Sequence, residues 1–309
     1  MRRSVAMILT VLVAACAGDD DDHDGREAVA LPGEALYPEG IAIAADGTIL
    51  VGSLREGSIL RVPPGAEAAE AEPFAAPGAN GMVSTVGLHA DQTRGLLWAC
   101  SSDPGVSPLT GSSPPALKSF DLASGAAAGS AEMPEGGFCN DVAADADGNI
   151  YVSDSFAPRI LVLPAGAGEL TTWLSDPAFA GDGFNLNGIA VAGGALHAVK
   201  YNSGELFRVP IGEDGAAGAP EVVALDRALE LPDGLRAAGD DLLVVEGIGR
   251  LSRVAPGGAV TSLADGLDGP TSVAVSGGDA WVVEGQLGNL FDPSSGAPDL
   301  PFQLVRVAL

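Results

Sequence analysis

Six copies of one sequence pattern follow each other along this chain of 309 residues. Each copy has a small residue near its start, then an apolar strand, a turn and a second apolar strand. Equivalent positions in successive copies lie 47, 54, 47, 46 and 38 residues apart. A repeat of this length predicts one supersecondary unit that recurs six times. The copies begin at Pro38, Thr85, Cys139, Leu186, Pro232 and Pro270.

Further short strands follow the first two in the repeats. SILRVPP (58–64) and RILVLPA (159–165) are typical third strands, and ELTTWLSD (169–176) and AVTSLADG (259–266) are typical fourth strands. The 43 glycines and 22 prolines suit many short strands joined by tight turns. We therefore predict an all-β chain that forms a six-bladed β-propeller. The blades must close into a ring, because only neighbouring blades can cover their apolar faces.

The sixth repeat ends at FQLVRVAL (302–309), which supplies a third strand but no fourth. The segment EAVALPGEALY (27–37) resembles the outer strand of the other repeats. We expect it to pair with the last blade, which would join the two chain ends and remove an open sheet edge. The propeller is then a single domain over residues 27–309.

The N-terminus has the pattern of an export signal. Residues 1–15 contain a basic start, an apolar stretch and a small-residue cleavage site. The segment VAAC resembles a lipoprotein signal, which would make Cys16 the lipidated first residue; a plain secretory signal is the alternative. Residues 16–26 then form an acidic tether. We expect a bacterial cell-envelope lipoprotein on the periplasmic side, favouring the outer membrane, whose membrane contact is the lipid alone.

The chain is strongly acidic, with a formal net charge of −26 and an isoelectric point near 4.1. Such a charge repels phosphate backbones, so nucleic acid is not an expected partner. A small-molecule substrate and a monomeric protein are expected instead. Only Cys100 and Cys139 remain after Cys16, and both fall at the entry end of adjacent repeats. An exported chain with one such pair suggests a disulfide, with two separate buried thiols as the alternative.

In four of the six repeats, a residue with a carboxylate or carboxamide side chain stands immediately before the first strand. In a propeller these positions converge at one end of the central axis. Each residue taken alone could be an ordinary turn cap. Two carboxylates crowded together, however, need a positive charge between them. The six entry residues are Glu39, Val86, Asn140, Asn187, Asp233 and Thr271.

The donors at these positions are all oxygen atoms, which hard cations prefer. We predict one divalent cation held by Glu39, Asn140, Asn187 and Asp233. Calcium is expected first, then magnesium or manganese, and zinc is a less natural choice.

The segments PEG, NDVAADADG, LNG and PDG, in this order, resemble the senescence marker protein/gluconolactonase family over essentially the whole mature chain. The resemblance implies that Glu39, Asn187 and Asp233 are the core metal ligands, with Asn140 a fourth ligand or a substrate contact. The paraoxonases and diisopropyl fluorophosphatase are similar too. The resemblance therefore implies hydrolysis but does not choose between lactones and phosphoesters.

The chain departs from that family near the expected site. Sugar-lactone hydrolases often have an Arg two residues before the Asn-Asp pair, where this chain has Phe138. The sequence after Glu39-Gly40 is IAIA, in place of a Pro and a nearby Trp. We therefore expect a pocket less suited to a polyhydroxy sugar acid.

The expected activity is metal-assisted hydrolysis of a lactone or ester. Asp233 would accept a proton from the attacking water, or act as a nucleophile in a phosphotriesterase-like variant, while Asn140 orients the substrate. A non-catalytic propeller that binds a ligand or partner on the cell envelope is the alternative.

Other candidates have simpler interpretations. Asp145, Asp147 and Asn149 mimic a calcium loop, but the spacing fails an EF-hand and DADGN is a typical hairpin turn. His89 is expected to be structural. Glu246 and Glu284, at the ends of second strands, are expected to be solvent-facing turn residues or to line the pocket rim.

Overall fold

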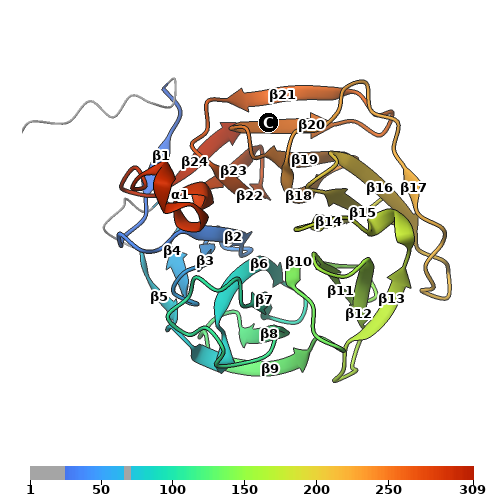
Figure 1. Ribbon diagram of the computed structural model, residues 1–309, viewed down its shortest axis with the longest axis horizontal. Coiled ribbons are helices and arrows are strands. Elements are labelled where there is room, and N and C mark those ends of the chain that lie inside the picture. The colour runs from blue at the N-terminus through green and yellow to red at the C-terminus, as the bar shows by residue number, and fades with distance from the viewer. Residues whose placement is uncertain (1–24, 66–70) are drawn as a thin grey trace, which may run out of the picture.

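The computed structural model describes residues 25–65 and 71–309. Six four-stranded sheets are arranged as blades around a common axis, with the first strand of each blade innermost (Figure 1). All strand pairings within the blades are antiparallel, as expected for strands joined by short turns. The predicted all-β, six-bladed propeller is confirmed.

The first three blades follow the chain from the inside outwards. Blade one contains β2 (Pro38–Ile43), β3 (Ile49–Ser53), β4 (Ile59–Val62) and β5 (Glu72–Ala75). Blade two contains β6 (Ser84–Asp91), β7 (Leu96–Ser102), β8 (Ala116–Asp121) and β9 (Ala127–Glu132). Blade three contains β10 (Cys139–Ala144), β11 (Ile150–Asp154), β12 (Arg159–Leu163) and β13 (Thr171–Ser175).

The last three blades continue the same order. Blade four contains β14 (Leu186–Ala192), β15 (Ala195–Lys200), β16 (Glu205–Pro210) and β17 (Glu221–Val222). Blade five contains β18 (Pro232–Ala238), β19 (Asp241–Glu246), β20 (Arg250–Val254) and β21 (Val260–Asp265). Blade six contains β22 (Pro270–Ser276), β23 (Asp279–Glu284), β24 (Gln303–Ala308) and β1 (Ala28–Ala30).

The N-terminal strand closes the ring as predicted. Strand β1 pairs with β24, with Ala28 opposite Val305 and Ala30 opposite Gln303. The pairing is extended by a hydrogen bond from the Leu31 amide to the Phe302 carbonyl. The outer edge of β24 is therefore covered by the first described strand of the chain (Figure 1).

The core is divided among the six contacts between neighbouring blades. Each hydrophobic cluster joins inner strands of two adjacent blades, as Ile41, Val51, Val283 and Leu304 do between blades one and six. The same arrangement recurs at the other five contacts. No single blade encloses its own core, so stability depends on closure of the ring.

Glycines after the entry residues allow the inner strands to approach closely. A Cβ atom on Gly40 would lie 2.1 Å from the Val86 carbonyl oxygen, and one on Gly188 would lie 2.3 Å from the Asp233 carbonyl oxygen. These positions therefore exclude any side chain without a shift of the neighbouring strand. The repeated glycine is explained by this packing around the axis.

Helical segments among residues 25–65 and 71–309 are short. They comprise α1 (Leu287–Phe291) and the 3₁₀ turns η2 (Ala79–Gly81), η3 (Pro177–Phe179) and η4 (Pro293–Ser295). No helix in the described part of the chain is long and apolar enough to cross a membrane. The predicted signal segment (1–15) and most of the tether (16–26), including Cys16, lie outside the described residues.

Candidate metal and substrate site

The four predicted polar entry residues line a single pocket of about 330 Å³. Each comes from a different inner strand. Glu39 lies on β2, Asn140 on β10, Asn187 on β14 and Asp233 on β18. The other two entry residues, Val86 and Thr271, also line this pocket. Glu39, Asn140 and Asn187 are only 7%, 4% and 6% exposed.

A β-bulge places each entry residue. The pairing of the first and second strands shifts register at the same point in every blade, and the shifted segment contains the entry residue. Bulges turn a side chain away from the regular alternation of a strand. The shifts lie at 38–41, 85–88, 139–142, 186–189, 232–235 and 270–272.

The orientation of the Asn140 carboxamide is set by a buried serine. Its Nδ2 donates a hydrogen bond of 2.8 Å to Ser155 Oγ, and that hydroxyl donates in turn to the Leu186 carbonyl oxygen at 2.6 Å. Asn140 Oδ1 is buried and has no hydrogen-bond partner. The carboxamide therefore offers a bare oxygen inside the protein.

The two carboxylates of the pocket are electrostatically destabilised. Burial raises the pKa of Glu39 well above its usual value, and the negative charges of Asp233 and Asp141 raise it further. Burial and Asp141 raise the pKa of Asp233 to about 8, while a hydrogen bond from Asn187 lowers it. Glu39 Oε2 is a second buried oxygen without a hydrogen-bond partner. A positive charge between these groups would relieve this repulsion.

Asp141 and Arg236 form an ion pair that the sequence analysis did not identify. Arg236 Nη1 lies 2.7 Å from Asp141 Oδ2, and Nη2 lies 3.1 Å from Oδ1. Nη2 also donates to the Leu88 carbonyl oxygen of β6, so Arg236 reaches from blade five to blades two and three. The signal was present: Asp141 occupies a position that is Gly in four of the six repeats.

Two other titratable side chains lie near these charges. His89 is partly buried, and its pKa is lowered to about 4 by burial and by the charge of Arg236. Tyr201 lines the pocket, and burial together with the charge of Asp233 raises its pKa. Tyr201 was not identified from the sequence, although it follows the second strand of blade four at the entry end.

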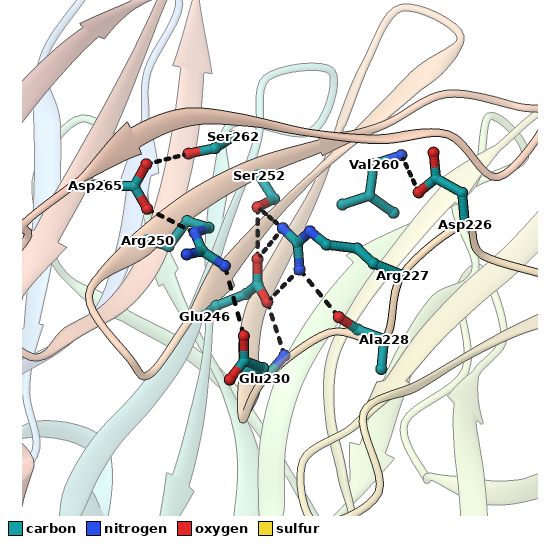
Figure 2. Close-up of polar contacts among 10 residues, drawn as sticks. All are labelled: Asp226, Arg227, Ala228, Glu230, Glu246, Arg250, Ser252, Val260, Ser262 and Asp265. Carbon is teal, nitrogen blue, oxygen red and sulfur yellow. Dashed lines mark hydrogen bonds and ion pairs between the residues drawn. The ribbon is translucent and has the colours of Figure 1, made fainter.

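The expectation that Glu246 faces solvent or the pocket rim was wrong. Its side chain is fully buried and accepts hydrogen bonds of 2.7 and 2.9 Å from Arg227 (Figure 2). It also accepts from the Glu230 amide at 2.7 Å, three residues before Asp233. Glu284 is likewise buried and accepts from the Asp268 amide at 2.7 Å. Both carboxylates therefore hold the loops that enter the first strands.

Asp154 has the same position in blade three. Its Oδ1 accepts a hydrogen bond of 2.9 Å from the Phe138 amide, and Arg159 Nε lies 2.9 Å from its Oδ2. Cys139, the next residue, forms a disulfide with Cys100. The predicted disulfide is confirmed, and the segment before Asn140 is fixed from both sides. A structural disulfide also indicates an oxidising location outside the cytoplasm.

The apparent calcium loop is a hairpin turn, as predicted. Residues 145–149 connect β10 to β11. Asp145 accepts hydrogen bonds from the Gly148 and Asn149 amides and from the Tyr151 hydroxyl. These internal donors satisfy the carboxylate, so it serves the turn.

The pocket residues fit a hard divalent cation by their chemistry. Among the described residues, no group of three or more His, Cys, Asp or Glu side chains is placed to hold a metal ion. The predicted set contains only two carboxylates and obtains its other oxygens from carboxamides. The bare oxygens of Glu39 and Asn140 are the kind of donor that calcium uses.

Solved structures of other proteins share the six-bladed β-propeller fold of this chain. A gluconolactonase from Xanthomonas campestris has a TM-score of 0.65, 16% identity, and coverage of 93% of this chain and 91% of its own. Regucalcin from Agrobacterium tumefaciens, described as a calcium-binding protein, has a TM-score of 0.63, 18% identity, and coverage of 92% and 95%.

Virginiamycin B lyase from Staphylococcus aureus has a TM-score of 0.62, 12% identity, and coverage of 92% of this chain and 98% of its own. No family model matches the sequence, and no curated protein matches it. The structural similarity to gluconolactonases and regucalcin thus extends over about 92% of the chain, and at these identities the shared property is the fold.

Proposed function

We propose that this protein is a divalent-metal-dependent hydrolase of small lactones or esters, with calcium as the metal. One observation carries the proposal: Glu39 Oε2 and Asn140 Oδ1 are buried without hydrogen-bond partners in a pocket that also contains Asn187 and Asp233. Buried polar atoms are rarely left unpaired, so two bare oxygens in one pocket call for a bound ion or water. Two proteins with the same fold support the proposal: the gluconolactonase supports lactone hydrolysis, and the calcium-binding regucalcin supports calcium as the metal.

Glu39, Asn140, Asn187 and Asp233 would hold the ion. Because Asn140 Nδ2 is engaged by Ser155, its oxygen is left for ligation, which favours a ligand role over donation to a substrate. A bound divalent cation supplies electrophilic polarisation of a carbonyl oxygen.

Asp233 would act as the general base, through an oxygen that does not bind the ion. The oxygen of water bonds to the carbonyl carbon, and the bond from this carbon to the ring or ester oxygen breaks. Asp233 accepts the proton that water loses and returns it to the leaving oxygen, so that a lactone yields a hydroxy acid.

The experiment combines calorimetry with a substrate screen. The purified protein is titrated with Ca²⁺ and then assayed on lactones, aryl esters and a phosphotriester, with chelator and after calcium is restored. We expect one ion to bind, and lactone or ester hydrolysis to be lost with chelator and recovered with calcium. Glu39→Gln should weaken calcium binding at least about tenfold, since it removes a charged ligand.

Glu169→Gln is the matched control, because Glu169 is exposed and does not line the pocket. It should bind calcium as the natural chain does. Full hydrolytic activity in Asp233→Ala would exclude the mechanism. Calcium binding without activity on any substrate class would instead support the non-catalytic propeller, and activity on the phosphotriester alone would support phosphoester chemistry.

We further propose that the protein is an exported monomer anchored to the cell envelope through a lipid on Cys16. The disulfide supports export, since such bonds persist outside the cytoplasm. Mass spectrometry of the N-terminal peptide of the natural protein tests the lipid directly.

A further inference from the structure

The pocket has two chemically different parts. Its polar side chains lie at the entry end of the blades and are Glu39, Asn140, Asn187, Asp233, Thr271 and Tyr201. The remaining large side chains form a set called here the apolar wall, which comprises Leu54, Val86, Phe138, Phe184, Leu287 and Phe291. None of the described residues that line the pocket is Lys, Arg or His.

Aromatic contacts make part of the apolar wall rigid. The ring centroids of Phe138 and Phe184 lie 5.2 Å apart with the planes nearly perpendicular. Phe156 contacts both rings, with centroids 5.0 Å from each. Such edge-to-face and tilted contacts hold large apolar rings in defined positions. Phe138 is also the residue that stands where the resembling sugar-lactone hydrolases often have Arg.

Exposed apolar side chains also occur at the pocket end of the blades. Seven large hydrophobic residues are exposed in the described part of the chain, and five of them belong to loops at the entry end of the blades. These loops follow second strands or precede first strands, so the antiparallel order puts them at the pocket end. The five residues, called here the apolar rim, are Phe156, Leu231, Ile248, Phe291 and Leu300.

Phe291 connects the two sets, because it lines the pocket and is 46% exposed. It lies on α1, which is inserted between β23 and β24. An exposed apolar group beside an apolar cavity is typical of a site that an apolar molecule covers. A cavity of about 330 Å³ lies in the range that holds small organic ligands.

We propose that the substrate is a neutral lactone or ester with an aryl or medium-length alkyl group. Its carbonyl group lies at Glu39, Asn140, Asn187 and Asp233, and its apolar group lies against Phe138, Phe184 and Leu287. An alkyl group of the substrate that is longer than the pocket continues over the apolar rim. This assignment rests on the proposed hydrolase function and names its substrate class.

Charge and hydrogen bonding both favour this class. The formal charge of −26 disfavours an anionic substrate, and no basic side chain lines the pocket to offset it. A polyhydroxy substrate would lose its water against the apolar wall without gaining hydrogen bonds there. The hydroxy-acid product carries a carboxylate after losing its proton, so the same charge favours its release.

The test measures kcat/KM with calcium for γ-butyrolactone, its hexyl-substituted form γ-decanolactone, and glucono-δ-lactone. Each buried methylene contributes about fourfold in affinity, so γ-decanolactone should exceed γ-butyrolactone by about 100-fold or more, with the sugar lactone lowest. Phe184→Gln should reduce this ratio at least about fivefold, and Phe184→Leu should restore most of it. Val222→Ser removes an exposed apolar group outside the apolar rim and should leave the ratio unchanged.

A binding measurement separates failure of this assignment from failure of the proposed function. Calorimetry compares the hexyl-substituted γ-lactam with unsubstituted γ-lactam, which are not hydrolysed in the assay. Preferential binding of the hexyl form supports the apolar site even if no ester or lactone is cleaved. Equal binding of the two lactams, or a preference for glucono-δ-lactone, would overturn the assignment.

Discussion

Arg236 provides an internal positive charge close to two carboxylates, those of Asp141 and Glu39. It binds Asp141 with two hydrogen bonds and lowers the otherwise raised pKa of Glu39. The guanidinium also donates to the Leu88 and Leu235 carbonyl oxygens, so it joins three blades near the axis. A buried ion pair with this many partners is costly to break from one side.

We expect Arg236→Met to destabilise the protein by about 3–5 kcal/mol, because Asp141 is left buried and charged without its partner. Urea unfolding followed by fluorescence measures the loss. Arg236→Met combined with Asp141→Asn should recover at least half of it. A single variant as stable as the natural chain would show that the pair is not needed.

His89 predicts a pH dependence of stability. Its pKa is lowered to about 4, below the ordinary value of 6.5, by burial and Arg236, while Asp91 and Asp141 oppose the shift. Neutral His89 is therefore favoured in the folded state. This contribution to stability is complete above about pH 6.5, falls as the pH drops towards 4, and amounts to at most about 3 kcal/mol.

The measurement compares the unfolding free energies of the natural chain and His89→Gln between pH 7.5 and pH 4 in the presence of chelator. The two proteins must be compared because Glu39 and Asp233 also titrate. Their pKa values are raised in the folded state, so these two groups add stability as the pH falls, whereas His89 removes it. The natural chain should lose more stability than His89→Gln on acidification. Parallel curves would contradict the assignment.

At the scale of elements, the blades could be predicted because each repeat has the same alternation of strands and turns. The entry residues could be predicted because Glu39, Asn140, Asn187 and Asp233 share one position in that repeat. The bulges that aim them could not, because a bulge depends on the pairing register and leaves no fixed residue pattern.

Two further features could not be predicted because they leave no signal in the local sequence. The connection between β23 and β24 contains α1, a helix of five residues that is too short for a periodic signal. Glu246 was misjudged because its partner Arg227 lies 19 residues away, in the connection before β18. Its burial follows from the folded blade and not from the VVEG segment itself.

For the whole molecule, closure by β1 is the contact on which the ring depends. We expect a chain that begins at residue 32 to be less stable than one that begins at residue 25, by about 3–6 kcal/mol, because the buried side chains of Val29 and Leu31 are lost. The bared edge of β24 should also promote association.

Chemical unfolding and light scattering of the two chains check both effects. A chain from residue 32 that stays monomeric with an unchanged unfolding midpoint would show that the ring closes without its first strand. Val222→Ser is a suitable control, since it alters an outer strand without opening an edge.

Strands β1 and β24 stand at opposite ends of the chain, and one is synthesised first and the other last. While the chain grows, residues 28–30 have no partner to pair with until residues 303–305 have been made. The first blade meets the same delay, since its inner face packs on blade six. The last blade therefore lacks its outer pairing until residues 303–305 have been made, and a chain that stops before them leaves the edge of β1 unpaired.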